Sequence, residues 1–200
     1  MAAYPAVLDI TQPATFSRGQ IGIRLVILIV VGWVFGWLYL IFPVAAAIQI
    51  SQRGSEKYVA EAEQSMTKWL RLALAAYAYM IILTDRLPTD EPKDTLRFQV
   101  TPRGAPTVGA TLLRIILAIP HAFVLGILGF VSAILVFVAA IFVLGQESYP
   151  AGIYNFNRGI LRWQARLYVY LAGLADGYPP FALDTEPEGG APSAPQATPV

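Results

Sequence analysis

The sequence predicts an all-α integral membrane protein: two tandem helical hairpins with about four membrane helices, and short β-strands on the face shared by the termini. Two observations lead to this prediction, namely two long apolar runs and a sequence pattern that recurs about 90 residues later. The composition agrees, because 56% of the 200 residues are hydrophobic and only 14% are charged. Soluble domains usually carry about 25% charged residues, so water is not expected to be the only solvent.

The two apolar runs are predicted to be transmembrane helices. Leu25–Ile50 contains 26 residues and Ile115–Leu144 contains 30, and neither run includes a charged residue. As a helix, the shorter run is roughly 39 Å long, which exceeds the roughly 30 Å hydrocarbon layer of a bilayer. Helices of soluble proteins rarely remain apolar on every face over this length.

A helix of graded polarity follows each run, over Glu61–Leu83 and Ala151–Leu174. Each begins with polar residues and ends with apolar ones. Each therefore either enters the membrane tilted or has its polar face covered by neighbouring helices. Stretches that alternate apolar and polar residues, VLDITQP near the start and LRFQVTP at 96–102, predict two short strands.

The graded helices end in an internal repeat. The segment YAYMIILTDRLP returns as YVYLAGLADGYP 91 residues later, and Arg24 and Arg114 are 90 residues apart. We therefore predict a first repeat over 1–89, a second over 90–183 and a disordered tail over 184–200, which is rich in Pro, Gly and acidic residues. Two hairpins in series would run parallel, which would place both strands, both turns and both termini on one face.

Composition and motifs exclude several function classes. The formal net charge of +1 gives no electrostatic case for nucleic acid as a partner. The lack of cysteine removes thiolate metal sites, iron–sulfur clusters and cysteine nucleophiles, and the single histidine cannot complete a metal-ligand set. No GxSxG, HExxH or Walker A motif occurs. We therefore expect no cofactor, no metal and no catalytic residue, and predict that the protein is not an enzyme.

Several motifs of the second half carry a resemblance to a known family. The segments RIILAIPHAFVL, YPAGIYNF, GILRWQARLYVYL and DGYPPF resemble an uncharacterised family of bacterial membrane domains that is classed only as a domain of unknown function. The first half looks like a degenerate copy, with Val31 near the place of His121 and Tyr58-Val59 in place of Tyr149-Pro150. The resemblance implies a multi-pass protein of the bacterial cytoplasmic membrane and carries over no activity or ligand.

The candidate functional residues fall into four groups. Arginines on a graded helix can hold anionic lipid headgroups, because guanidinium groups bind phosphate in bidentate fashion; this group is Arg71, Arg158, Arg162 and Arg166. Ordinary snorkelling, or pairing with local acids, is the alternative. Small residues predicted to let helices pack closely are Gly32, Gly36, Gly126 and Gly129. Residues predicted to lie at the membrane interface are Tyr77, Tyr79, His121, Trp163, Tyr168 and Tyr170. Asp85 and Asp176 are predicted to stabilise equivalent turns.

These observations predict a non-enzymatic accessory or scaffold subunit that packs against a larger membrane complex or binds anionic lipid. Its expected partners are membrane lipids and other membrane protein subunits. A small transporter or channel with its path between the repeats is the alternative, and a lipid-modifying enzyme that uses His121 with Asp176 is a third hypothesis. Basic residues tie at seven on each side of the membrane, so only the missing signal peptide favours termini in the cytoplasm.

Overall fold

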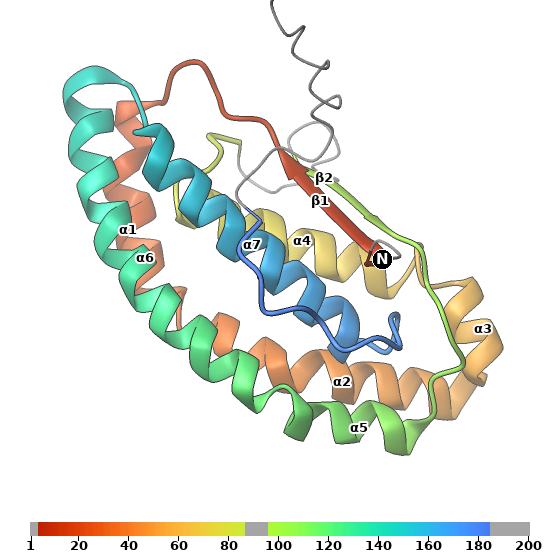
Figure 1. The fold of residues 1–200 in the computed structure, drawn as a ribbon. Coiled ribbons are helices and arrows are strands. Elements are labelled where there is room, and N and C mark those ends of the chain that lie inside the picture. The colour runs from red at the N-terminus through yellow and green to blue at the C-terminus, as the bar shows by residue number, and fades with distance from the viewer. Residues whose placement is uncertain (1–3, 87–95, 185–200) are drawn as a thin grey trace, which may run out of the picture.

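The computed structural model describes residues 4–86 and 96–184, which are mostly helical with a small two-stranded sheet (Figure 1). The elements, in chain order, are β1 (Ala6–Ile10), the 3-10 helix η1 (Arg18–Gln20), α1 (Ile21–Val31), α2 (Val34–Arg53), α3 (Ser55–Ala60), α4 (Met66–Met80), β2 (Leu96–Val100), α5 (Val108–Leu117), α6 (Ile119–Gln146) and α7 (Ala151–Leu171). The predicted boundary at 89/90, and the predicted disordered tail after Asp184, lie outside the described residues.

Each predicted apolar run forms two helices rather than one. The first run breaks at Gly32, between α1 and α2, and the second breaks at Ala118, between α5 and α6. Glycine weakens a helix, and Pro120 is tolerated only because it lies in the first turn of α6. Among the described helices, α2 and α6 are long and apolar enough to cross a membrane, so four membrane helices are not seen.

The helix pairs α1–α2 and α5–α6 lie side by side and run in opposite directions (Figure 1). The amide of Phe16 donates to the carbonyl of Glu147 at 3.0 Å, which places the start of α1 beside the end of α6. Val108 and Leu112 of α5 share a pocket with Ile48 near the end of α2. The prediction that the two repeats run parallel is therefore wrong. A sequence pattern repeats identically whichever way its copies point, so the repeat alone could not reveal the direction.

Strand pairing accounts for the reversal. β1 and β2 pair antiparallel, with Leu8 opposite Phe98 and Ile10 opposite Leu96. Leu8 and Phe98 are 90 residues apart, the same spacing as Arg24 and Arg114, so corresponding residues of the two halves face each other at the centre of the sheet. An approximate twofold relation between the halves follows. The two predicted strands are confirmed.

Helices α4 and α7 lie between the bent helix pairs and the sheet (Figure 1). Every residue of α7 from Asn157 to Leu171 is buried, polar ones included. Neighbouring elements thus cover the polar face of this graded helix, which is the second of the two arrangements predicted for it. Several hydrogen-bonding groups on α7 are consequently paired inside the protein, among them the side chains of Arg162 and Gln164.

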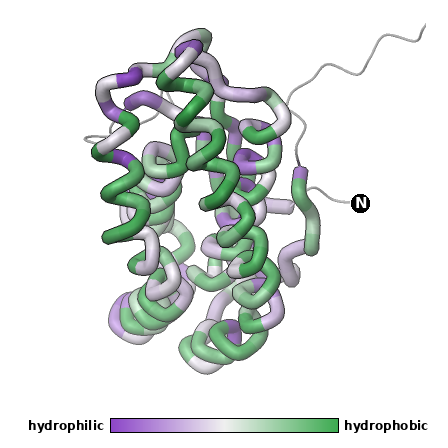
Figure 2. The backbone as a smooth tube through the Cα atoms, turned by 90° about the vertical axis from the view of Figure 1, so that its left-hand side faces the viewer, coloured by the Kyte–Doolittle hydropathy of each residue, from purple (hydrophilic) through white to green (hydrophobic). Residues whose placement is uncertain are grey.

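The outer face of the bent helices is apolar and exposed. Figure 2, which looks onto α1 and α6, shows hydrophobic residues along both helices. Large apolar side chains that are more than half exposed on α1, α2, α5 and α6 include Ile23, Val26, Ile29, Trp37, Ile116, Phe123, Phe130 and Ile141, and Trp33 in the turn between α1 and α2 is exposed as well. Only 28% of the most apolar window of α2, and the same share in α6, is buried inside the protein. A core helix of a soluble protein would be mostly buried.

Candidate functional site

The same polar cluster occurs in both halves. The Arg24 guanidinium lies 4.2 Å from the ring centre of Tyr79 and 2.8 Å from the Asp85 carboxylate. Ninety or 91 residues later, the Arg114 guanidinium lies 4.7 Å from the Tyr170 ring and 3.4 Å from Asp176. Each arginine also donates to a carbonyl in the turn that carries the aspartate. Each aspartate thus pairs with a buried arginine beside its own turn, and the turns after α4 and α7 lie at opposite ends of the molecule (Figure 1).

A second set of contacts ties each half to the other. The Tyr58 hydroxyl donates to the carbonyl of Ala172 at 2.5 Å, and the Tyr149 hydroxyl donates to the carbonyl of Ile81 at 3.3 Å. Donor and acceptor are both shifted by 91 residues between the two bonds. Burial raises the pKa of both hydroxyls above the ordinary value of 10.0, so both remain protonated donors at physiological pH.

The four arginines predicted to bind lipid headgroups are buried and hold protein partners. Arg162 donates to the carbonyl of Leu8 and pairs with Asp9, each at 3.0 Å. Arg71, 91 residues earlier, donates to the carbonyl of Phe98 and pairs with Glu63. Arg166 pairs with Asp184, and Arg158 donates to Asn155. Three of the four arginines pair with an acidic side chain, which is the kind of contact that the alternative interpretation expected. Headgroup binding stays a prediction, and these contacts give it no support.

His121 is buried within an aromatic cluster whose outer members, Tyr178 and Phe181, are exposed. The Trp163 indole donates to Nδ1 of His121 at 2.9 Å, so the ring proton of a neutral imidazole is carried on Nε2. The Phe181 ring stacks on the imidazole with centroids 3.9 Å apart, and Tyr178 contacts it from the side. The cluster fastens the segment after α7 onto the start of α6.

The remaining predicted interface and packing residues lie inside the protein or beside a pocket. Tyr79, Tyr168 and Tyr170 are buried and Tyr77 is half-buried, so none of the four stands free on the surface. A Cβ atom added to Gly36, Gly126 or Gly129 would meet no atom within 4 Å. These glycines therefore do not mediate close helix packing within this chain, and packing against a partner stays a prediction.

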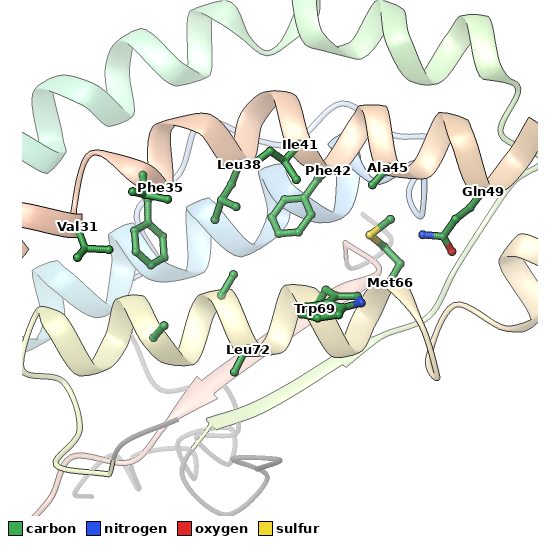
Figure 3. A pocket seen from close by; sticks show the side chains of 13 residues that line it. Val31, Phe35, Leu38, Ile41, Phe42, Ala45, Gln49, Met66, Trp69 and Leu72 are labelled. Atoms are coloured by element: carbon green, nitrogen blue, oxygen red, sulfur yellow. The ribbon is translucent and has the colours of Figure 1, made fainter. Parts of the chain in front are cut away.

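An open apolar groove lies between α2 and α4, with a volume of about 480 Å³. Figure 3 shows Phe35, Leu38 and Phe42 pointing from α2 toward α4, where Trp69 forms the opposite wall. Gln49, at one end, is the single amide or charged side chain in the lining of this groove. The site can therefore take an apolar group, with the Gln49 amide at one end and the Trp69 indole N–H as hydrogen-bonding groups. Sequence reasoning missed this groove.

Small residues line the groove where the other half carries larger ones. Ala45, Ala73 and Ala76 line it. At spacings of 90 and 91 residues, the second half carries Leu135, Gln164 and Leu167 instead. In the second half, α6 and α7 pack together and the Ser132 hydroxyl donates to Asn157 at 2.6 Å. In the first half, the positions that correspond to Ser132 and Asn157 are Phe42 and Met66, and the groove there is open. Three alanines on facing helices were the sequence signal that could have found it.

No group of three or more His, Cys, Asp or Glu side chains that could hold a metal ion occurs in residues 4–86 and 96–184. His121 accepts from Trp163 and Asp176 pairs with Arg114. Each of these two residues, which the enzyme hypothesis would combine, is thus held by another partner.

Comparison with known proteins supports the resemblance seen in the second half. Residues 109–182 match a family model. Its description is Domain of unknown function (DUF4389), and the match covers less than half of the chain. The matched region runs from α5 to the segment after α7, so it contains the closed half and not the groove. No curated protein and no solved structure matches the chain.

Proposed function

We propose that this protein is a non-enzymatic membrane protein that holds one lipid acyl chain in the groove between α2 and α4. In this proposal the apolar outer face of α1, α2, α5 and α6 lies in the hydrocarbon layer, and the first half of the chain is a diverged copy of the domain found in the second. The groove is the observation that carries the proposal. Exposed apolar surface of this extent is costly in water, at about 25 cal/mol per Å², and costs nothing in hydrocarbon.

The size of the groove supports a chain as the occupant. Its volume of about 480 Å³ lies within the range of small-ligand sites. A partner helix of twenty residues, roughly 10 Å wide and 30 Å long, would occupy roughly 2,400 Å³. Along α4 the lining extends from Met66 to Ala76, roughly 15 Å, which is half the roughly 30 Å thickness of the hydrocarbon layer. One acyl chain of a single leaflet has that reach.

The polar end of the groove supports an orientation for the lipid. Gln49 lies one helical turn before Arg53, where α2 ends and the chain becomes charged. A lipid whose headgroup lies at this end would place its ester carbonyl near the Gln49 amide. The lining carries no charged side chain, so we expect chain length to affect retention more than headgroup charge does. Anionic lipid, expected from the sequence, then has no special advantage.

Native mass spectrometry of the protein in mild detergent tests the proposal. The wild-type protein is expected to retain one phospholipid when supplied with either phosphatidylcholine or phosphatidylglycerol. Replacing two groove alanines by their second-half counterparts, Ala45→Leu with Ala76→Leu, is expected to remove that lipid. Gly22→Leu is the matched control, because a Cβ there meets no atom within 4 Å on the exposed face of α1, and it should leave the bound lipid in place.

Two results would contradict the proposal. One is equal lipid retention in the double variant and the control, which would place the lipid elsewhere on the apolar face. The other is a wild-type protein that leaves the detergent with a defined protein subunit and no lipid. The second result would favour the accessory-subunit hypothesis, since the groove would then lie against a protein.

A further inference from the structure

A second pocket, of about 390 Å³, lies where the two halves meet. It is distinct from the groove, with Phe35 contributing to the lining of both. Its rim includes Gly36 of α2 and Gly126 of α6, which are 90 residues apart and therefore occupy corresponding positions. Both glycines are exposed, and a Cβ at either would meet no atom within 4 Å. The glycines thus form an opening onto the exposed apolar face of the bent helices.

The pocket holds several polar groups inside otherwise apolar walls. Gln164 donates to the Tyr168 hydroxyl at 2.7 Å, and the Tyr168 hydroxyl donates to the carbonyl of Phe35 at 3.3 Å. Tyr39 lies beside the same Gln164 side chain. The polar groups contributed by α7 are therefore already engaged in hydrogen bonds within the protein.

Tyr77 differs from its counterpart in this respect. It corresponds to Tyr168 at a spacing of 91 residues and lines the pocket, but its hydroxyl has no hydrogen-bond partner within residues 4–86 and 96–184, where Phe35 contacts its ring. A half-buried hydroxyl beside a pocket is a donor that a bound molecule can satisfy. A purely hydrocarbon ligand would leave it unpaired.

We propose that this pocket binds an apolar molecule that carries a carbonyl oxygen, which accepts a hydrogen bond from the Tyr77 hydroxyl. The glycine opening admits the molecule from the apolar face, and the aromatic and aliphatic walls bury its body. A quinone ring and the ester of an acylglycerol both present this chemistry. The site is independent of the acyl-chain groove, because Tyr77, Gly126 and Gln164 do not line that groove. A transport path at this boundary stays a prediction.

Binding of a short-chain prenyl benzoquinone and of a diacylglycerol, each measured by native mass spectrometry on the full-length protein, tests the site. Gly126→Leu should abolish binding because the side chain fills the opening. Gly129→Leu, three residues further along α6 and outside the lining, should bind like wild type. Tyr77→Phe removes only the hydroxyl and should weaken binding about three- to tenfold, the usual effect of one lost neutral hydrogen bond.

The outcomes separate the two sources of the carbonyl and can overturn the proposal. Binding of the quinone alone would assign the site to a redox-active lipid, and binding of the diacylglycerol alone would assign it to a membrane lipid. Equal affinity of Tyr77→Phe and wild type for both probes would overturn the proposal, as would equal effects of the two glycine variants or the binding of neither probe. Retention of phospholipid in the α2–α4 groove would be unchanged in all of these variants.

Discussion

The two halves of the chain share several polar contacts and differ in how tightly their helices pack. Each half has an arginine against a tyrosine ring beside an aspartate turn, and each donates a buried arginine to the other half's strand. In the second half, α7 packs against α6 and a Ser132–Asn157 hydrogen bond joins them. In the first half, the corresponding space between α2 and α4 is an open groove of about 480 Å³.

This difference indicates which features the fold needs. The buried arginines Arg24 and Arg114 and the hydroxyls of Tyr58 and Tyr149 recur with corresponding partners, since a buried guanidinium or hydroxyl without a partner would cost several kcal/mol. The size of apolar side chains can differ between the halves. Where the second half has Leu135 and Leu167, the first has the smaller Ala45 and Ala76, which lose packing contacts but leave no polar group unsatisfied. The groove is thus a feature that the framework permits and does not require, which makes it available for a ligand.

The largest expected effect comes from breaking the arginine contacts that cross between the halves. The Arg162 side chain is 1% exposed and pairs with Asp9, so Arg162→Leu leaves a carboxylate and a strand carbonyl without their donor. We expect a loss of about 3–5 kcal/mol in unfolding free energy. Arg71→Leu should cost only about 1–2 kcal/mol, because its partner Glu63 is 60% exposed and stays hydrated. Thermal unfolding in detergent, followed by circular dichroism, measures both.

Equal losses in the two arginine variants would contradict this account, since the two contacts would then be energetically equivalent despite their different exposure. An Arg162→Leu protein as stable as wild type would be more serious. It would mean that the contacts of the guanidinium with Asp9 and Leu8 do not stabilise the fold. The sequence-based prediction of headgroup binding by this arginine would then gain support.

A smaller effect is expected from opening the closed half. Leu167 is fully buried in the core, so Leu167→Ala should cost about 3 kcal/mol through lost transfer energy and the cavity left behind. The reverse exchange at the corresponding position, Ala76→Leu, should change stability by less than about 1 kcal/mol, because the new side chain enters an open groove. The same unfolding assay compares them. Similar costs for both would show that the groove is closed in solution.

The sequence predicted the elements and the correspondence between them better than their arrangement. Strands, apolar runs and graded helices follow from local periodicity, and the spacing of 90 to 91 residues correctly matches Arg24 with Arg114 and Tyr58 with Tyr149. The relative direction of the two repeats was predicted wrongly, because it depends on the pairing of β1 with β2. That pairing is a long-range contact and leaves no local pattern in the sequence. The sequence left open whether α7 is covered or tilted into the membrane, because the partners of its arginines, such as Asp9, are distant in sequence.

The candidate sites were harder to predict than the fold. Charged residues and the single histidine are few in this chain and were therefore the natural candidates for a site, yet His121 accepts the Trp163 indole proton inside the protein. The groove and the pocket instead depend on residues with small side chains or none. Ala73, Ala76 and Gly126 carry no functional group that would mark a site in the sequence, and they leave open space only because of how their neighbours are arranged.

The smallest expected effect separates the two aspartate turns. The Asp85 side chain is 24% exposed, lies 2.8 Å from the buried Arg24 and accepts the Ser17 amide proton at 2.8 Å, so Asp85→Asn should cost about 1–2 kcal/mol. Asp176 is 58% exposed and lies 3.4 Å from Arg114, so Asp176→Asn should cost less than about 1 kcal/mol. Unfolding at low and high salt measures this difference, because salt screens the exposed pair more strongly.

If Asp176→Asn cost as much as Asp85→Asn at either salt concentration, exposure would not set the strength of these pairs. The two turns would then be energetically equivalent, and helix packing alone would distinguish the halves.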